Sequence, residues 1–255
     1  MERFDLIIVG GGLAGGLAAL ALAHEGIDVA LIDAEDPARF REEAFDGRTT
    51  AIAYASARVF RRLGLWPSIE NDAEPILDIL VTDGRAATAG RKAAQSAFHL
   101  HFDSRELETV EALGFIIENR VLRTAIYDEI GRTPRIALIA PSRAGEPKFS
   151  GGAASLSLDG GRRLEAPLII AADGKKSPLR AGAGVRCHSW DYPQTAIVTT
   201  VAHARGHDGV AQELFLPAGP FAILPMTGNR SSIVWTERRE AAPAFLALDD
   251  EAFLA

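Results

Sequence analysis

Residues 4–33 read FDLIIVGGGLAGGLAALALAHEGIDVALID, and this stretch decides the fold class. Phe4–Val9 is a short apolar run that ends at three glycines, which is typical of a buried parallel strand. Leu13–His24 contains Leu, Ala and Gly with almost no charge, so we expect a helix packed beneath a sheet and closed by Gly26. Asp28–Asp33 is a second apolar run. The segment therefore predicts a βαβ unit of about thirty residues.

The glycine pattern G-x-G-x-x-G at Gly10, Gly12 and Gly15 lies between this strand and helix. Gly10 permits a tight turn, Gly12 lets a pyrophosphate approach the backbone, and Gly15 allows close helix packing. The free N–H groups and the dipole of the helix favour the phosphate charge. Asp33, 23 residues after Gly10, is placed to accept hydrogen bonds from ribose hydroxyls. A glycine-rich turn that binds nothing is the alternative.

The composition of the 255-residue chain, 47% hydrophobic and 24% charged, is that of a globular protein. The net charge of -7 offers no basic field for a polyanion, so we expect no nucleic-acid partner. No apolar stretch reaches the roughly 18 residues that span a bilayer, and the start of the chain does not resemble a secretory signal. With the lone Cys187, these features predict a cytoplasmic protein.

Beyond Asp33 the regular alternation stops, and a long polar connection, Ala34–Arg48, ends in Asp46-Gly47-Arg48. The later apolar patterns predict helices at Thr49–Leu63, Ser104–Leu113 and Asn119–Ile130. They predict strands at Ile76–Thr82, Ala97–Phe102, Phe115–Glu118, Arg135–Ala140, Ala153–Leu158, Arg163–Ala172, Cys187–Trp190, Thr195–Ala202, Val210–Leu216, Phe221–Met226 and Ser231–Thr236. Pro243–Ala255 is predicted to begin an acidic helix.

Two histidines alternate with apolar residues in one of these strands. The alternation places Phe98, Leu100 and Phe102 on its buried side and His99 and His101 on its outer or cavity-facing side. An H-x-H pair can bind metal, but no cluster of acids or cysteines at ligand spacing accompanies it in the sequence. We therefore predict no metal site.

A second motif follows the strand predicted at Arg163–Ala172, which runs into Asp173-Gly174 and then Ser177 and Arg180. An acid and a glycine at the carboxyl end of a buried strand occupy the crevice where open α/β sheets bind ligands. An ordinary Asp-Gly turn followed by a helix cap is the alternative interpretation.

These motifs together resemble the FAD-dependent class A aromatic monooxygenases, and within them the ubiquinone-biosynthesis hydroxylases that act on polyprenylated phenols. GGGLAGG with Asp33 is similar to that family's ADP-binding site, Asp46-Gly47-Arg48 to its DGR segment, and Ala172-Asp173-Gly174 to its ADG segment. The narrower resemblance rests on Gly114–Ile126 (GFIIENRVLRTAI), Gln194–Val198 (QTAIV), Ala211–Phe215 (AQELF), Gly219–Pro225 (GPFAILP) and Val234–Thr236 (VWT).

The resemblance implies an α/β fold in which a Rossmann-like FAD-binding domain, of the glutathione-reductase and para-hydroxybenzoate-hydroxylase type, is interleaved with a mixed β-sheet substrate domain. The FAD-binding domain would comprise residues 1–72 and 104–182, and the substrate domain residues 73–103 and 183–255. The cofactor-binding residues that the resemblance implies are Gly10, Gly12, Leu13, Ala14, Gly15, Asp33, Arg48, Asn119, Arg123, Asp173 and Gly174. For Asn119 and Arg123, a helix cap and a solvated cation are the alternatives.

The resemblance also implies a reaction, in which NAD(P)H reduces FAD, dioxygen forms a flavin C4a-hydroperoxide, and an oxygen atom is transferred to the phenol ring. The protein must bind the flavin, orient the phenol ring and exclude water, so this chemistry requires no catalytic triad, and we assign no catalytic residue. Gln194 and Glu213 are candidates to orient the phenol, although each suits a sheet surface equally well.

The family's third flavin motif, a Gly-Asp-Ala-type segment, does not occur between Trp235 and Ala255, so we expect a fragment or a truncated product. A non-catalytic flavin-binding module and an FAD-dependent polyprenyl-lipid reductase therefore stay open as alternatives. A substrate with an isoprenoid tail implies peripheral contact with the inner face of the membrane, and the family implies a ubiquinone-biosynthesis assembly. The acidic net charge supplies no polybasic attraction to lipid.

Overall fold

The computed structural model describes residues 1–39, 45, 47–83, 99–108 and 110–254. The chain forms two compact units. The first comprises Met1–Ala44, Phe60–Ile69 and Arg120–Ser189, and the second comprises Phe45–Val59, Glu70–Asn119 and Trp190–Ala255. The second unit thus contains residues 45–59, 70–72 and 104–119, which were predicted to belong to the cofactor domain. The functional extent of that domain stays a prediction.

The first unit is built around a parallel sheet with the strand order β13–β2–β3–β9. These strands are β13 (Ile169–Ala171), β2 (Leu6–Val9), β3 (Val29–Ile32) and β9 (Ile136–Ile139). Every residue of β2 and β3 is buried, as continuous apolar runs in a parallel sheet require. Helix α1 (Leu13–His24) connects β2 to β3, so the predicted βαβ unit is confirmed.

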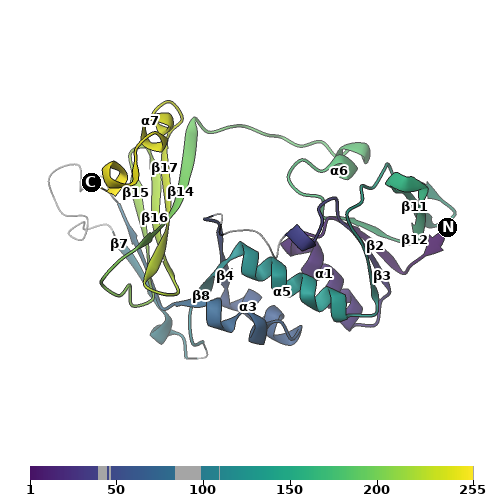
Figure 1. The fold of residues 1–255 in the computed structure, drawn as a ribbon, viewed down its shortest axis with the longest axis horizontal. Coiled ribbons are helices and arrows are strands. Elements are labelled where there is room, and N and C mark those ends of the chain that lie inside the picture. Colours follow the sequence, from purple (N-terminus) through teal and green to yellow (C-terminus); the bar gives the residue numbers. More distant parts are fainter. Residues whose placement is uncertain (40–44, 46, 84–98, 109, 255) are drawn as a thin grey trace. The chain divides into compact units, whose positions relative to one another are not determined.

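Layers cover both faces of this parallel sheet (Figure 1). On one side lie α1 and α5 (Asn119–Arg132), which approach closely because a Cβ at Gly16 would lie only 2.6 Å from Ile126 Cγ2. On the other side, Ile7 and Ile32 pack in one core with Leu156 and Leu164. The latter belong to a sheet ordered β1–β12–β11–β10, with β1 at Glu2–Arg3, β12 at Arg163–Ala166, β11 at Ala153–Ser157 and β10 at Lys148–Ser150.

The strand predicted at Arg163–Ala172 is in fact two strands, β12 and β13, in different sheets. Pro167 lies between them. Proline has no N–H to donate to a ladder, which favours a break there. The unit is completed by helix α6 (Pro178–Gly182) and the short 3-10 helices η1 (Trp66–Ser68) and η5 (Asp159–Gly161).

The second unit contains two sheets. The larger has the order β14–β17–β16–β15–β6–β7, formed by Gln194–Ala202, Arg230–Arg238, Gly219–Met226, Val210–Leu216, Asp78–Thr82 and His99–Asp103. The smaller is β4–β8–β5, formed by Thr49–Ala53, Gly114–Glu118 and Glu74–Ile76. Ile76 and Ile116 of the smaller sheet pack against Ala211 and Met226 of the larger one.

Two short helices replace the acidic helix predicted at Pro243–Ala255, namely α7 (Ala242–Leu246) and α8 (Asp250–Leu254). Both place an aromatic ring on Trp235 of β17, with ring centroids 4.4 Å apart for Phe245 and 6.0 Å apart for Phe253. None of the helices in the described part of the chain has the length and apolar character needed to span a bilayer.

The helix predicted at Thr49–Leu63 begins instead as strand β4 and becomes helix α3 only over Tyr54–Arg62. β4 pairs antiparallel with β8. Gly114 of β8 permits the close approach, because a Cβ there would lie 2.6 Å from the carbonyl oxygen of Ile52. Strand pairing in the tertiary structure therefore overrides the local helical pattern.

The helix predicted at Ser104–Leu113 is also wrong, since only one 3-10 turn, η4 (Ser104–Glu106), forms there. Asp103 caps this turn by accepting a hydrogen bond from Arg105 N at 2.8 Å. Leu107 then returns to an extended backbone with φ -107° and ψ 104°. A further 3-10 turn, η2 (Glu70–Asp72), precedes β5.

Two predictions about strands also fail. Cys187–Trp190 has no regular secondary structure, and Trp190 is 72% exposed, so this segment has no buried face to favour a strand. Leu100 and Phe102, predicted to face the core, are 62% and 50% exposed, and His99 and His101 on the other face of β7 are exposed as well. Some predicted features lie outside the described residues, namely residues 40–44 and Asp46 of the polar connection, Ala97, Phe98 and Thr109.

Candidate functional site

The loop Gly10–Gly12 joins the carboxyl end of β2 to α1. Gly10 has φ +103°, and a Cβ there would lie 2.8 Å from Asp173 N, so this position requires glycine. A Cβ at Gly15 would collide with the carbonyl oxygen of Gly10. At Gly12, in contrast, a Cβ would meet no atom of the described residues within 4 Å. The absent side chain there leaves space for a ligand rather than for the protein.

The first turn of α1 is suited to an anion. Gly12 provides no side-chain cap, and the first turn contains no acidic residue. The first intrahelical hydrogen bond runs from Gly16 N to Gly12 O at 2.8 Å. The N–H groups of Leu13 and Ala14 lie before it, where a helix offers them no partner, and the helix dipole adds partial positive charge. These features fit a pyrophosphate.

Asp33 lies immediately after β3, and its carboxylate faces the same loop. Its Oδ2 accepts hydrogen bonds from Gly11 N at 2.5 Å and from the Tyr127 hydroxyl at 3.1 Å. Its Oδ1 accepts one from Glu35 N at 2.8 Å. These three donors hold the carboxylate in a fixed orientation, and carboxylate oxygens are acceptors that can bind the hydroxyls of a ribose.

Asp173 and Gly174 follow β13, which lies beside β2 with Ala172 N donating to Val9 O at 2.7 Å. Asp173 Oδ2 accepts a hydrogen bond from Leu179 N at 3.2 Å. Its Oδ1 is buried, and no group of the described residues hydrogen-bonds to it. A buried carboxylate oxygen without a donor is unfavourable, so a ligand hydroxyl suits this position.

The segment after Gly174 is held by two residues that the sequence motif contains. The Ser177 hydroxyl accepts a hydrogen bond from Arg180 N at 2.9 Å and so caps α6. The Arg180 guanidinium donates to the carbonyl oxygen of Lys175 at 2.6 Å. These contacts fix the loop that carries Asp173.

A cavity of about 370 Å³ lies where these loops converge. The predicted residues that line it are Gly10, Gly12, Asp33, Arg123, Asp173 and Gly174. Another part of its lining, Ser142–Ala144, follows β9 and was not predicted from the sequence. β9 is a parallel neighbour of β3, so its carboxyl end reaches the same edge of the sheet. A prediction that β9 pairs with β3 would have placed the Ser142–Ala144 loop at this edge of the sheet.

Asp159 holds the Ser142–Ala144 loop. The Ser142 hydroxyl donates a hydrogen bond to Asp159 Oδ1, and Arg143 N donates to the same oxygen at 3.0 Å. These bonds, that of Ser142 first, lower the pKa of the Asp159 carboxyl below its ordinary value. The loop is therefore anchored by an ionised side chain.

Arg48 and Asn119, the other two predicted cofactor residues, belong to the second unit. Asn119 N donates to the carbonyl oxygen of Arg48 at 3.0 Å, and the Thr50 hydroxyl donates to Asn119 Oδ1 at 2.5 Å. The two residues are thus neighbours across β4 and β8. Their contact with a cofactor stays a prediction.

The candidates for orienting a substrate differ in their surroundings. Gln194 is exposed, and its amide donates to the carbonyl oxygen of Ala218 at 2.7 Å. Glu213, on β15, is half-buried between the paired residues Val81 and Ala222. Burial raises the pKa of the Glu213 carboxyl. Of the two side chains, Glu213 has the surroundings that favour a proton acceptor.

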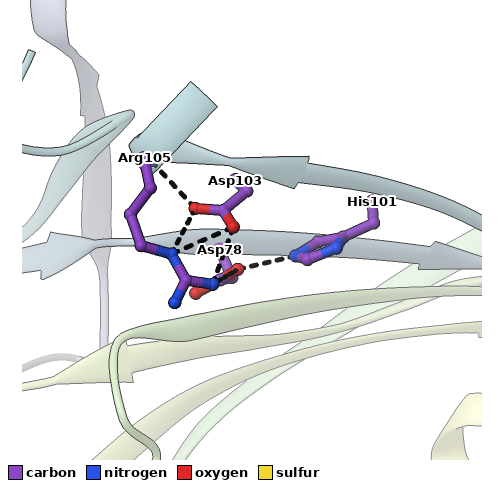
Figure 2. Close-up of polar contacts among 4 residues, drawn as sticks. All are labelled: Asp78, His101, Asp103 and Arg105. Carbon is purple, nitrogen blue, oxygen red and sulfur yellow. Dashed lines mark hydrogen bonds and ion pairs between the residues drawn. The ribbon is translucent and has the colours of Figure 1, made fainter. Parts of the chain in front are cut away.

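His101 lies beside two acids that the sequence did not place near it (Figure 2). Strand pairing sets Asp78 of β6 directly opposite Asp103 of β7, and the three side chains offer ligand atoms within 4.8 Å of one another. His101 Nε2 contacts Asp78 Oδ1 at 2.6 Å. Two carboxylates in facing positions repel each other, and Arg105 offsets this by binding Asp103 at 2.6 Å and lying 3.9 Å from Asp78.

Loss of the Arg105 guanidinium is expected to raise the pKa of Asp103. The Arg105 side chain first, and its backbone N–H second, hold this pKa at about 2, below the ordinary 3.8. The ionised pair therefore contributes stability above pH 3.8 that is lost as the pH falls through about 2. In a carboxyl-detected NMR titration, Arg105→Gln should move the Asp103 midpoint towards 3.8, whereas Arg132→Gln should not. An unchanged midpoint in Arg105→Gln would contradict the assignment.

A glycine-rich turn at a helix start, an acid after the next strand and a second loop from a neighbouring parallel strand define a dinucleotide-binding protein of the α/β class. Residues 3–136 match the FAD binding domain family, so the chain belongs to that family. The dinucleotide is thus FAD, and the predicted fold class and cofactor are confirmed. The open space at Gly12 and Asp173 Oδ1, which has no hydrogen-bond partner in the described part of the chain, fit such a ligand.

The chain is similar in sequence to curated hydroxylases. The chain is 45% identical over 251 residues to ubiquinone hydroxylase UbiL of Rhodospirillum rubrum, and 31% identical over 233 residues to 3-demethoxyubiquinol 3-hydroxylase of Escherichia coli. The matches cover 98% and 91% of this chain but 56% of each relative. The chain therefore spans about half the length of the curated relatives it matches.

A solved structure shows the same fold. PqsL of Pseudomonas aeruginosa, a probable FAD-dependent monooxygenase, superimposes with a TM-score of 0.78 at 19% identity. The match covers 96% of this chain and 64% of PqsL. At this identity the likeness concerns the fold alone.

Proposed function

We propose that this chain forms the cofactor-binding and substrate-sheet part of an FAD-dependent monooxygenase that hydroxylates the ring of a polyprenylated phenol in ubiquinone biosynthesis. NAD(P)H would be the reductant and dioxygen the source of the oxygen atom. The observation that carries the substrate class is the 45% identity to a ubiquinone hydroxylase along 98% of the chain. Bound FAD supplies the electron transfer and oxygen activation that amino-acid side chains do not.

The residues of the first unit would bind the adenosine diphosphate half of FAD. The N–H groups of Leu13 and Ala14 would face the pyrophosphate across the open position at Gly12. Asp33 would accept a ribose hydroxyl, and the free Oδ1 of Asp173 would accept a second hydroxyl of the cofactor. Each role follows from an acceptor or donor that the protein itself leaves available.

In the second unit, Arg48 and Asn119 would contact the polar parts of the cofactor, and Glu213 would accept a hydrogen bond from the phenol hydroxyl. The raised pKa of Glu213 brings it nearer to that of a phenol and so favours proton sharing between the two groups. A polyprenyl tail would further imply peripheral membrane contact, which a flotation assay with liposomes tests directly.

The experiment is an assay of the FAD-loaded protein with NAD(P)H, a polyprenylphenol and isotopically labelled dioxygen. Phenol-stimulated NAD(P)H oxidation with label in the product ring is the expected result. Reduction of the isoprenoid tail without label would favour a reductase. Failure of NAD(P)H to bleach the bound flavin would favour a flavin-binding module without turnover.

A further inference from the structure

Tyr127 of α5 contacts the candidate ribose acceptor although it lies 94 residues away in the sequence. Its side chain is almost fully buried, with the residue 6% exposed. The hydroxyl donates a hydrogen bond to Asp33 Oδ2 at 3.1 Å. No motif of the sequence includes Tyr127, and its contact arises only because α5 packs beside α1.

The residue at position 11 shows how tightly this contact is built. Gly11 is the variable residue between two motif glycines, so the binding motif itself does not require glycine there. A Cβ at Gly11 would collide with the Tyr127 hydroxyl oxygen and lie 2.6 Å from Asp33 Oδ2. The middle glycine of the sequence GGG is therefore explained by the Tyr127–Asp33 contact.

The hydrogen bonds to Asp33 determine which oxygen is available to a ligand. Each carboxylate oxygen has two acceptor positions. Oδ2 already accepts from Gly11 N and from the Tyr127 hydroxyl. Oδ1 accepts from Glu35 N alone among the described residues, at 2.8 Å. The remaining acceptor position is thus on Oδ1, and Asp33 lines the cavity.

Tyr127 remains a donor across the working pH range. Burial first, and the adjacent charge of Asp33 second, raise the pKa of the Tyr127 hydroxyl above its ordinary value of 10.0. The proton therefore stays on the tyrosine oxygen, and Oδ2 stays occupied as an acceptor.

We propose that Tyr127 is a positioning residue for FAD binding: its hydroxyl holds Asp33 Oδ2 towards the protein, so that Oδ1 presents its free acceptor position to the adenosine ribose. The proposal rests on the assignment of Asp33 as the ribose acceptor. It does not depend on which substrate is hydroxylated, or on turnover. Tyr127 acts through Asp33 and need not touch the cofactor.

The test is a double-mutant cycle on FAD affinity, with Tyr127→Phe and Asp33→Ala measured singly and together by flavin fluorescence. Tyr127→Phe should raise the Kd about three- to tenfold, the net contribution of one typical hydrogen bond. In the Asp33→Ala background the same substitution should have no effect on the Kd. ADP, used as a competitor that carries the ribose without the flavin, should show the same pattern. Tyr192→Phe, at a side chain 66% exposed, is the matched control.

A purely structural role gives a different pattern. Removal of the hydroxyl would then weaken binding equally with and without Asp33, or would lower the melting temperature and leave the affinity of the folded protein unchanged. Either outcome overturns the proposal. An unchanged Kd in Asp33→Ala alone would overturn the ribose assignment with it. A lack of hydroxylase activity would contradict only the proposed function.

Discussion

Gly12→Val is expected to weaken FAD binding by about 100-fold or more, a loss of at least about 2.7 kcal/mol, while the protein stays folded. A Cβ at Gly12 meets none of the atoms within the described ranges at 4 Å or less, and φ is -58°, which valine adopts without strain. The new side chain would instead fill the space where the pyrophosphate approaches the helix N–H groups. Titration with FAD measures the loss, and circular dichroism follows the fold.

Gly15→Val is the informative control, because a side chain at Gly15 would collide with the protein itself rather than with the ligand. A Cβ at Gly15 would collide with the carbonyl oxygen of Gly10, and backbone cannot yield as a flexible side chain does. We expect a loss of about 3 kcal/mol in the free energy of unfolding, whereas Gly12→Val should stay within about 0.5 kcal/mol of wild type. Unimpaired FAD binding by Gly12→Val would show that the loop is not the pyrophosphate site.

The first βαβ unit could be predicted from sequence because its determinants are local. The strand, the glycines and the helix occupy consecutive residues, and the motif glycines Gly12 and Gly15 are explained by a ligand and by Gly10 of the same loop. The acid after the next strand follows from the same geometry. Asp173 was also predictable, since the strand before it ends in an apolar run.

The parts that sequence reasoning missed depend on pairings between distant segments. Thr49–Ala53 has a helical pattern, yet it forms a strand because Gly114 offers a close-fitting partner. Tyr127 reaches Asp33 only through the packing of α5, and Asp78 reaches His101 only through the register of β6 and β7. A pattern within one segment does not contain such information.

Arg230→Ala should destabilise the second unit by about 2 kcal/mol. The guanidinium donates to Glu118 Oε1 at 3.1 Å and to the carbonyl oxygen of Thr227 at 3.0 Å. The Glu118 side chain is 8% exposed, and the Arg230 side chain is 32% exposed. Removing one partner of a buried ion pair costs about 3 to 5 kcal/mol, and the solvent around Arg230 reduces that figure.

Glu118 is the last residue of β8 and directly precedes Asn119, the first residue of α5. The ion pair joins β8 to β17, which belong to different sheets. Urea unfolding followed by tryptophan fluorescence measures the free energy of unfolding of Arg230→Ala relative to wild type. Arg238→Ala, an exposed position at the other end of β17, should stay within about 0.5 kcal/mol of wild type.

Measuring Arg230→Ala in the Glu118→Gln variant separates the loss of the ion pair from the loss of packing by the Arg230 side chain. Arg230→Ala leaves the buried Glu118 carboxylate without its cation. If this causes the destabilisation, Arg230→Ala should lower the free energy of unfolding by at least about 1 kcal/mol less in the Glu118→Gln variant, because a neutral amide loses less when the cation is removed. If the two substitutions are additive, the other contacts of Arg230, namely its aliphatic part and its hydrogen bond to Thr227, carry the stabilisation. The ion pair would then contribute little to the junction of β8 and β17.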